Sequence, residues 1–194
     1  MLNARALGEL LSQNSDQRLC KRWFLMTPNG TLLAHSQTEN LKDLRKGVTA
    51  AALSWQEQNE IARHLSGSSE GTVATASTHL HTLIFESASK NVLIRKLQPQ
   101  LLLVLEGGVP PRKPSFEVRI TVEGADGQPL RRHAAGDSSP SASVSSKAES
   151  SMSTATAGVL ALHRRKLDAM AEAILNDFEQ TGFKMPENGA DQLF

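Results

Sequence analysis

The sequence predicts an α/β fold, and three observations support that prediction. Between Gly30 and Glu106 the pattern reads strand–helix–strand–strand–strand, and a second long helix follows only after a serine-rich segment. Asn29-Gly30 lies between two β-prone runs, which is a strong hairpin signal. The run 101–105 is continuously apolar, as expected for a central strand that is covered on both faces.

The elements can be placed in order along the chain. A short amphipathic helix is expected first, capped by Asn3, with Leu7 and Leu11 on its apolar face. A long helix begins after the cap Asn40 and ends at Gly67. The remaining predictions are strands at 22–27, 31–35, 77–86, 92–97 and 101–105, and a final helix over 155–182.

The long helix carries apolar and small residues around most of its circumference. One stripe contains positions 44, 48, 52 and 55, and a second, mostly of small residues, contains 47, 50, 51, 54, 58, 61 and 65. A helix that is apolar on so wide a face must be buried on two sides. Either a second layer of the same chain or another protein would cover the second side. We favour another chain, because small side chains let two helices approach closely, and this favours an assembly protein over an enzyme.

The sequence changes character after residue 106. Gly107-Gly108 and the following prolines are expected to break the sheet, and 137–154 holds nine serines in eighteen residues. Such a segment has too little apolar surface to offset its ordering entropy. We therefore predict a main domain over 1–106 and a disordered insertion over 107–154, with a short hairpin near 116–130. The helix at 155–182 would complete the domain, and 183–194 would form a flexible tail.

Composition excludes several classes of function. The net charge of +1, from 21 basic and 20 acidic residues, gives no electrostatic reason to expect nucleic acid as a partner. The single cysteine, Cys20, fits a reducing compartment, and no apolar run is long enough for a membrane span. We therefore expect a soluble intracellular protein. The sequence also lacks a phosphate-binding glycine loop and any catalytic constellation, so neither a cofactor nor an enzymatic activity is predicted.

Two local patterns have a chemical interpretation beside a structural one. His79 and His81 share a strand face and would suit a metal if a third ligand were near, but we favour two outward polar residues. Cys20 precedes Lys21 and Arg22, whose charges would lower a thiol pKa. We favour an ordinary cysteine here, because no nearby histidine supports a nucleophile.

Several stretches resemble the roadblock family, and in particular the roadblock subunit of the Ragulator and fungal EGO complexes. They are Met1-Leu2, Ala6-Leu7 and 10–13 at the start, 29–36 on the hairpin, and 48–51 with Trp55 on the long helix. The resemblance covers roughly 1–106 and, more loosely, the final helix. The chain departs from it in the segment of nearly fifty residues before that helix.

The resemblance implies a sandwich in which helices cover a five-stranded antiparallel sheet, in the order α-β-β-α-β-β-β-α. It also implies obligate pairing with a second roadblock protein through the long helix and an edge strand. On this sequence the helix surface would contain Gly47, Ala50, Ala51, Ser54 and Gln58. The edge strand would contain His79, Leu80, His81, Thr82 and Leu83.

The function implied is scaffolding. A complex of this type recruits Rag-type GTPases to the cytoplasmic face of the late endosome, lysosome or vacuole for amino-acid-dependent TOR complex signalling. Other subunits, one of them lipid-anchored, would hold this chain at the membrane, and it would contribute at most to a nucleotide-exchange activity of the whole complex. The alternatives are a dynein-associated light chain and a GTPase-regulating homodimer of the bacterial kind. The serine-rich insertion favours a eukaryotic source.

Overall fold

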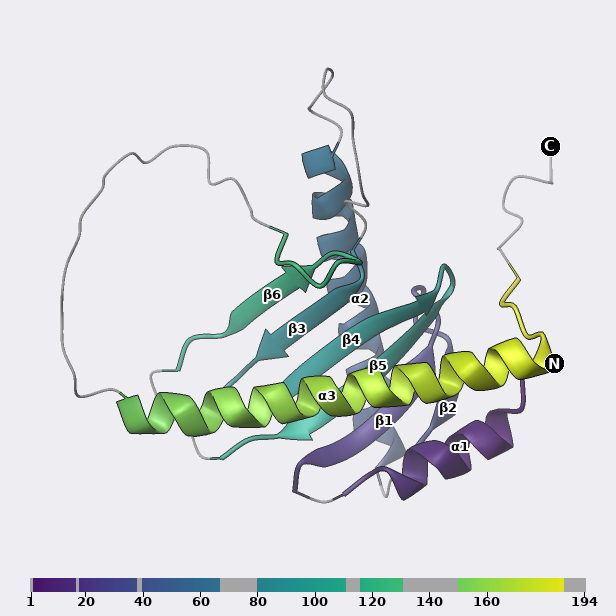
Figure 1. Cartoon of the computed structure of the whole chain (residues 1–194), viewed down its shortest axis with the longest axis horizontal. Coiled ribbons are helices and arrows are strands. Elements are labelled where there is room, and N and C mark those ends of the chain that lie inside the picture. Colours follow the sequence, from purple (N-terminus) through teal and green to yellow (C-terminus); the bar gives the residue numbers. More distant parts are fainter. Residues whose placement is uncertain are drawn as a thin grey trace.

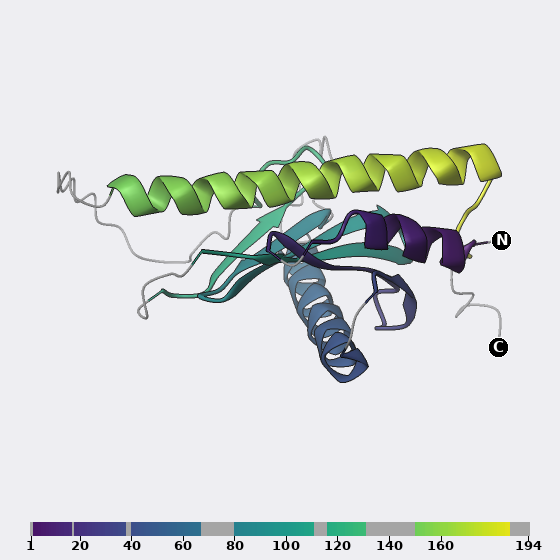
Figure 2. The ribbon, with the colours of Figure 1, turned by 90° about the horizontal axis from the view of Figure 1, so that it is seen from below.

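In the computed structural model, one antiparallel sheet lies between two layers of helices (Figures 1 and 2). Helices α1 and α3 cover one face of the sheet and α2 covers the other, as the view in Figure 2 shows. This arrangement confirms the predicted α/β sandwich, although the sheet has six strands and not five. The structure describes residues 2–16, 18–37, 40–66, 80–110, 116–130 and 150–186.

The sheet has the strand order β2-β1-β5-β4-β3-β6, and all neighbouring strands are antiparallel. Strand β5 lies in the middle and all eight of its residues are buried, so the prediction of a central strand from 101–105 is confirmed. The bounds are β1 Cys20–Met26, β2 Leu32–His35, β3 Thr82–Glu86, β4 Lys90–Gln98, β5 Leu101–Gly108 and β6 Arg119–Glu123.

Three helices complete the fold: α1 Ala4–Gln13, α2 Leu41–Ser66 and α3 Ser150–Thr181. Asn3 caps α1 as predicted, because its side chain accepts a hydrogen bond from the Ala6 N–H at 3.1 Å. The predicted hairpin joins β1 to β2. Its turn places Gly30 at φ +89°, a conformation that glycine adopts without steric cost. The predicted end of α2 at Gly67 lies outside the described residues.

The prediction that Gly107 and Gly108 break the sheet is wrong. Both residues belong to β5, and each is needed because another part of the chain occupies the space of a side chain. A Cβ at Gly107 would lie 2.3 Å from the ring of His163 on α3, and one at Gly108 would lie 1.9 Å from the Arg18 carbonyl oxygen. The glycine pair therefore extends the strand where α3 and the segment before β1 press closely on it.

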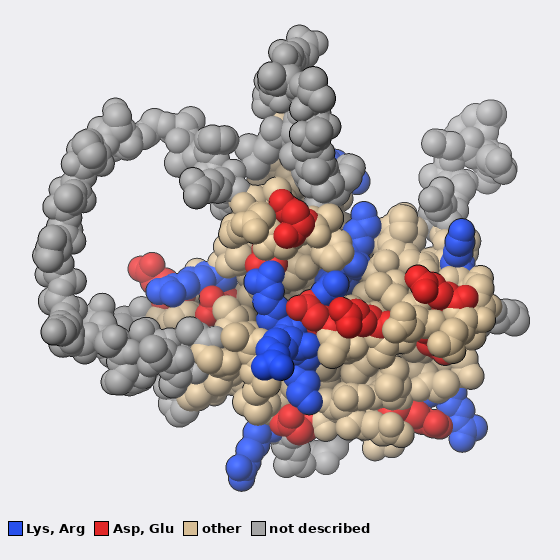
Figure 3. All heavy atoms as spheres, viewed as in Figure 1, with Lys and Arg blue, Asp and Glu red and all other residues tan. Residues whose placement is uncertain are grey.

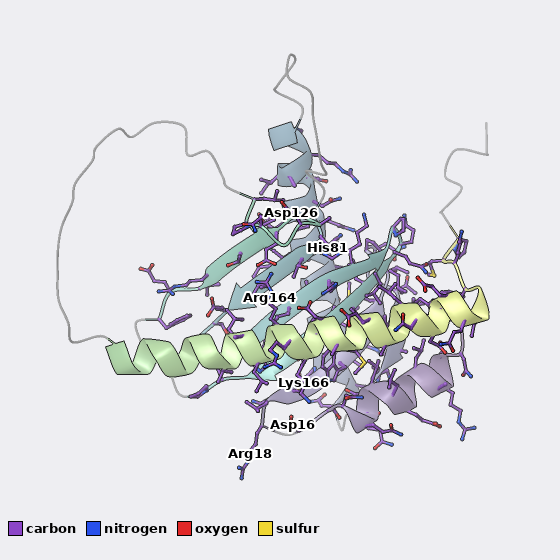
Figure 4. All side chains as sticks on the ribbon, viewed as in Figure 1. Asp16, Arg18, His81, Asp126, Arg164 and Lys166 are labelled. Carbon is purple, nitrogen blue, oxygen red and sulfur yellow. The ribbon has the colours of Figure 1, made fainter. Side chains whose placement is uncertain are left out.

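The segment after β5 contains a strand, which belongs to the short hairpin that the sequence predicted near 116–130 of the insertion. Residues 119–123 form β6, which pairs with β3, and the turn after it brings Pro129 into a bridge with Glu123. The buried Glu123 carboxylate accepts hydrogen bonds from both terminal nitrogens of Arg164 on α3, with Nη1–Oε1 at 2.7 Å. Figure 4 labels Arg164 of α3 on the side of the helix towards these strands. The expected hairpin near 116–130 therefore consists of β6, a turn and a short return at 129–130, and the Arg164–Glu123 pair ties it to α3.

The final helix begins earlier and is followed by more fixed structure than predicted. It starts at Ser150, and the residues after it pack back on the sheet. The Phe183 ring lies 4.8 Å from that of Phe178, and the Met185 N–H donates to Gln98 Oε1 at 2.7 Å. The described residues 183–186 are therefore no flexible tail. None of the helices in the described part of the chain is both long and apolar enough to cross a membrane.

Candidate functional site: the α2 face

Helix α2 begins at a cap that the sequence predicted. The Asn40 side-chain oxygen accepts a hydrogen bond from the Asp43 N–H at 3.1 Å, and the Asp43 carboxylate lies in the first turn, where the helix dipole favours negative charge. From there one stripe of the helix packs on β1, β3, β4 and β5. Trp55 is 4% exposed within this core, which confirms its prediction as a core residue. The buried stripe contains Leu44, Val48, Ala51, Ala52, Trp55 and Ala62.

The second stripe, predicted to face a partner, divides into two parts. Ala51 and Gln58 are 3% and 4% exposed, so they lie in the chain's own interior. Gly47 and Ser54 are half-buried, and Ala50 is exposed. The helix is turned so that the boundary between the predicted core stripe and the predicted partner stripe faces the strands. The chain's own interior therefore includes part of the predicted partner stripe.

Gly47 lies beside an ionic cluster on the sheet. Glu106 is bound by Lys90, with Nζ–Oε1 at 2.9 Å, and by Arg22, with Nη1–Oε2 at 3.4 Å. A Cβ at Gly47 would lie 2.9 Å from Glu106 Oε1. The glycine thus makes room for a carboxylate that two cations hold in place, which is a packing role within this chain.

A groove of about 240 Å³ runs between α2 and the sheet. Its helix wall consists of Gly47, Ala50, Ala51 and Ser54, which are four of the five α2 residues predicted for the partner surface. Phe85 of β3 and Val92 of β4 are directly opposite each other in the sheet; Phe85 is half-buried and Val92 is partly buried against the core. The sheet side of the groove is lined by Phe85, Ser87, Lys90, Val92 and Glu106. The groove is therefore mainly apolar, with the Glu106 cluster at one end.

The outer side of α2 has a polarity that sequence reasoning missed. Leu53 is 62% exposed and lines a hollow on this side together with Ala50, which also lines the groove. The exposed charged side chains just before Leu53 are basic and those just after it are acidic. The first turn of the helix also holds Asp43, and the last turn holds Arg63 and His64. The signal was present in the sequence, because an apolar residue at 53 lies outside both stripes. The charged residues concerned are Lys42, Arg45 and Lys46 on one side of Leu53 and Glu57 and Glu60 on the other.

The strand predicted to join a partner's sheet is not an edge in this structure. β6 pairs with β3 through five residues, from Thr82 opposite Glu123 to Glu86 opposite Arg119. Leu80, Thr82 and Leu83 are buried, and the His81 N–H donates to the Glu123 carbonyl at 2.9 Å. The edge-strand prediction for 79–83 is therefore wrong in the described residues, because a strand from the insertion occupies that edge. His79 lies outside the described residues.

His81 and Cys20 were the two residues considered for a chemical role. His81 is half-buried and Cys20 is buried. Burial lowers the pKa of His81, and the nearby charges of Arg95 and Lys96 lower it further. Burial raises the pKa of the Cys20 thiol, with Asp16 adding to the effect, so the interpretation of an activated thiol is wrong. No group of three His, Cys, Asp or Glu side chains within the described residues is arranged to hold a metal ion.

Comparison with known proteins gives a likeness at the level of the fold. No protein-family model matches the sequence, and no curated protein matches it. The structure of Myxococcus xanthus MglB superimposes with a TM-score of 0.51 at 12% identity, over 92% of this chain and 99% of that one. The chain has a roadblock-type fold.

Two further solved structures are less similar. The gliding protein MglB of Thermus thermophilus has a TM-score of 0.43 and 12% identity, over 56% of this chain and 76% of that one. A Roadblock/LC7 domain from Streptomyces avermitilis has a TM-score of 0.41 and 10% identity, over 53% of this chain and 76% of that one.

Proposed function

We propose that this chain is a non-enzymatic adaptor that acts with small GTPases and pairs with a second roadblock-fold protein through α2. The observation that carries the proposal is the exposed Leu53, which is 62% accessible. It lines a hollow on the outer side of α2 with Ala50, and Ala50 also lines the groove of small and apolar side chains. Removing apolar surface of this kind from water is favourable by about 25 cal/mol per Å², from which the entropic cost of association is subtracted. A partner helix laid along the groove would cover both.

The contents of the groove support a packing role for it. Its α2 wall carries only small side chains, so a second helix can come close to the backbone there. The Glu106 carboxylate at its end already has Lys90 and Arg22 as partners. The groove therefore presents little that a partner would have to neutralise.

The charge pattern of α2 supports one orientation of the partner helix. Lys46 precedes the apolar pair Ala50 and Leu53, and Glu57 follows it. A helix with the same order of charges would meet this pattern favourably when it runs antiparallel, because each basic end would lie beside an acidic end. We therefore place the partner helix antiparallel to α2.

The finer assignment is to a Ragulator- or EGO-type complex. In this proposal the chain helps to hold Rag-type GTPases at the lysosomal or vacuolar surface for amino-acid-dependent TOR complex signalling. Other subunits, including a lipid-anchored one, attach it to the membrane. The support comes from the sequence stretches that resemble the roadblock subunit of those complexes. They include the β1–β2 hairpin and part of the α2 segment that lines the groove.

The experiment compares two leucines on one helix. The tagged full-length chain is isolated from its native cells as wild type, as Leu53→Glu and as the matched control Leu41→Glu. Leu41 is 55% exposed but opens the helix, away from the groove. We expect wild type and Leu41→Glu to retain a second roadblock protein together with Rag-type GTPases, and Leu53→Glu to lose them.

Other outcomes would decide against the proposal. Retention of the same proteins by Leu53→Glu would show that the partner binds elsewhere. Recovery of dynein intermediate chains, without a Rag-type GTPase, would favour the motor-associated alternative.

A further inference from the structure

The two edges of the main sheet are covered by different parts of the chain (Figure 1). At the first edge, helix α1 packs beside the short strand β2. The Gln37 N–H donates to Ser12 Oγ at 2.9 Å, and a Cβ at Gly8 would lie 3.4 Å from the His35 carbonyl oxygen. At the second edge, β6 pairs with β3 over all five residues of β3. A sheet edge that is left open is a template for strand addition, and such covers prevent it.

Strand β3 has none of the features that discourage pairing when an edge strand is open. Its sequence over 82–86, Thr-Leu-Ile-Phe-Glu, contains no lysine and no proline, and its ladder with β6 has no bulge. Leu83 is 0% exposed in the core on the α2 side, and Ile84 is 2% exposed in the core on the α3 side. Because the two cores hold both faces of β3, what β6 covers is mainly the backbone edge of this strand.

β6 is held less firmly than the strands inside the sheet. Ile120 is 45% exposed, and Glu123 is the one buried residue among the five of β6. Besides the ladder with β3, the hairpin is tied to the domain by the Arg164–Glu123 ion pair and by the partly buried Val122 and Leu130. Strands with few buried apolar contacts open locally at a lower free energy than core strands.

Ile84 lies at the centre of the backbone edge that β6 covers. The Leu130 N–H donates to the Val122 carbonyl at 2.7 Å, so the polar backbone groups of Val122 point away from β3. These groups alternate along a strand, so those of Thr121 point toward β3 and pair with those of Ile84, its opposite residue.

From this arrangement we infer that the hairpin at 116–130 is an autoinhibitory cover on a strand-addition edge of β3. While it is closed, the backbone groups along that edge pair with β6. When it opens, the strand that fits the edge is β3 of a second copy of this chain, antiparallel about Ile84. That register places each Thr82 opposite a Glu86 and pairs the apolar residues between them, so no like charges meet.

The cover is separate from the α2 surface. The groove beside α2 contains Phe85 of β3 but no residue of the hairpin, so opening the hairpin leaves the helix wall of the groove unchanged. The inference therefore stands whether or not the proposed function is correct. It gives the segment between β5 and α3 a role in deciding when two copies can join.

The first test loosens the hairpin in the full-length chain. Thr121→Pro removes an N–H that points toward β3, whereas the matched control Ile120→Pro removes one that points away from it. Both variants and the parent carry Leu53→Glu, which removes pairing through α2, and are compared by sedimentation equilibrium. Apparent affinity scales with the fraction of open chains, so Thr121→Pro should self-associate roughly tenfold more tightly than the other two. Association no tighter than that of the parent or of Ile120→Pro would overturn the inference.

The second test closes the hairpin covalently. Glu86 and Arg119 are directly opposite each other, and such residues lie about 5.5 Å apart at Cα, within the reach of a disulfide. The natural Cys20 is 1% exposed and does not compete. Glu86→Cys and Arg119→Cys, added to the Thr121→Pro chain, should return association to the parent value when oxidised and release it on reduction. Association that is the same in both redox states would contradict the cover.

Hydrogen exchange locates the contact between copies. In the Thr121→Pro chain the Ile84 amide should be protected at high protein concentration and exchange on dilution. The Leu83 amide points toward β4 and is the internal control, which should not depend on concentration. Protection of Ile84 that does not change with concentration would place the contact elsewhere and overturn the inference. None of these outcomes alters the retention of GTPases that the experiment above measures.

Discussion

The two faces of the sheet are covered differently. On the α3 side, His163 is fully buried between the Asn91 side chain at 3.2 Å and the Leu19 carbonyl at 3.0 Å. Arg95–Asp168 and Arg164–Glu123 ion pairs fix the same helix, and Figure 3 shows basic and acidic side chains side by side on this face. On the other side a single helix covers the sheet and leaves a groove of about 240 Å³ beside it.

This difference indicates that the two faces have different roles. The α1–α3 face has two helices and a continuous core, which we expect to supply most of the stability of the fold. The α2 face leaves Leu53 62% exposed at a hollow that it lines with Ala50, a residue that also lines the groove. Substitutions on the closed face and on the open face should therefore differ in their effects.

Two adjacent alanines on α2 should respond very differently to the same substitution. Ala51→Glu would bury an unpaired carboxylate at a position that is 3% exposed, and should destabilise the fold by about 3–5 kcal/mol. Ala50→Glu, at an exposed position, should change the free energy of unfolding by less than about 0.5 kcal/mol. Urea unfolding of both variants measures the difference. Similar stabilities would show that the helix is rotated from the orientation described.

On the closed face, Gly107→Ala should force the His163 ring and α3 away from β5. The added Cβ would lie 2.3 Å from that ring, and overpacking of this kind costs about 1–3 kcal/mol. Gly158→Ala is the control, because nothing lies within 4 Å of a Cβ at this helical position. That change should instead stabilise the protein by about 0.5–1 kcal/mol. Thermal unfolding that ranks the two variants in the opposite order would refute this account of Gly107.

A smaller and local effect is expected where β6 meets α3. Burial raises the pKa of Glu123, although the Arg164 guanidinium acts against the shift. Arg164→Ala would leave that carboxylate buried without its cation, at a cost of about 1–3 kcal/mol. Hydrogen exchange should rise in β6 while the amides of β5 stay protected. A uniform rise over the sheet would mean that β6 does not open separately.

The smallest effect concerns the loop before β1. Burial acts to raise the pKa of Asp16, but hydrogen bonds from the Leu19, Arg18 and Cys20 N–H groups outweigh it and leave the pKa lowered. A carboxyl group whose pKa is lower in the folded chain than in the unfolded chain stabilises the fold at pH values above its unfolded pKa. That contribution is therefore present at neutral pH and is lost below about pH 4. Asp16→Asn should therefore cost about 0.5 kcal/mol at pH 7 and less at about pH 3. An equal cost at both pH values would contradict the assigned cause.

The features that the sequence predicted correctly are set by residues close together in the chain. The caps Asn3 and Asn40, the turn at Gly30 and the buried run 101–105 each follow from local pattern, and each is present. Trp55 was also placed correctly, because a large apolar residue in a helical stripe packs inward in most environments.

What the sequence could not reveal depends on distant contacts. Gly107-Gly108 looked like a break because its reason lies in His163, which is far away along the chain on α3. β6 could not be assigned to the β3 edge from its alternation alone, since strand alternation does not name a partner. Ala50 and Ala51 are adjacent on a helix and differ in exposure only because of how α2 is rotated on the sheet. The sequence therefore placed the partner surface on a helix that does have an open face. It wrongly included Ala51 and Gln58, which are buried in the chain's own interior.

Hydroxyl-radical footprinting can test directly whether another protein covers the α2 face. The assembly purified from native cells is compared with the isolated chain, and labelling is measured at Leu53 and, as the internal control, at the half-buried Leu160 on α3. We expect Leu53 to be labelled in the isolated chain and protected in the assembly, while Leu160 is labelled equally in both. Equal labelling of Leu53 in the two samples would contradict this expectation.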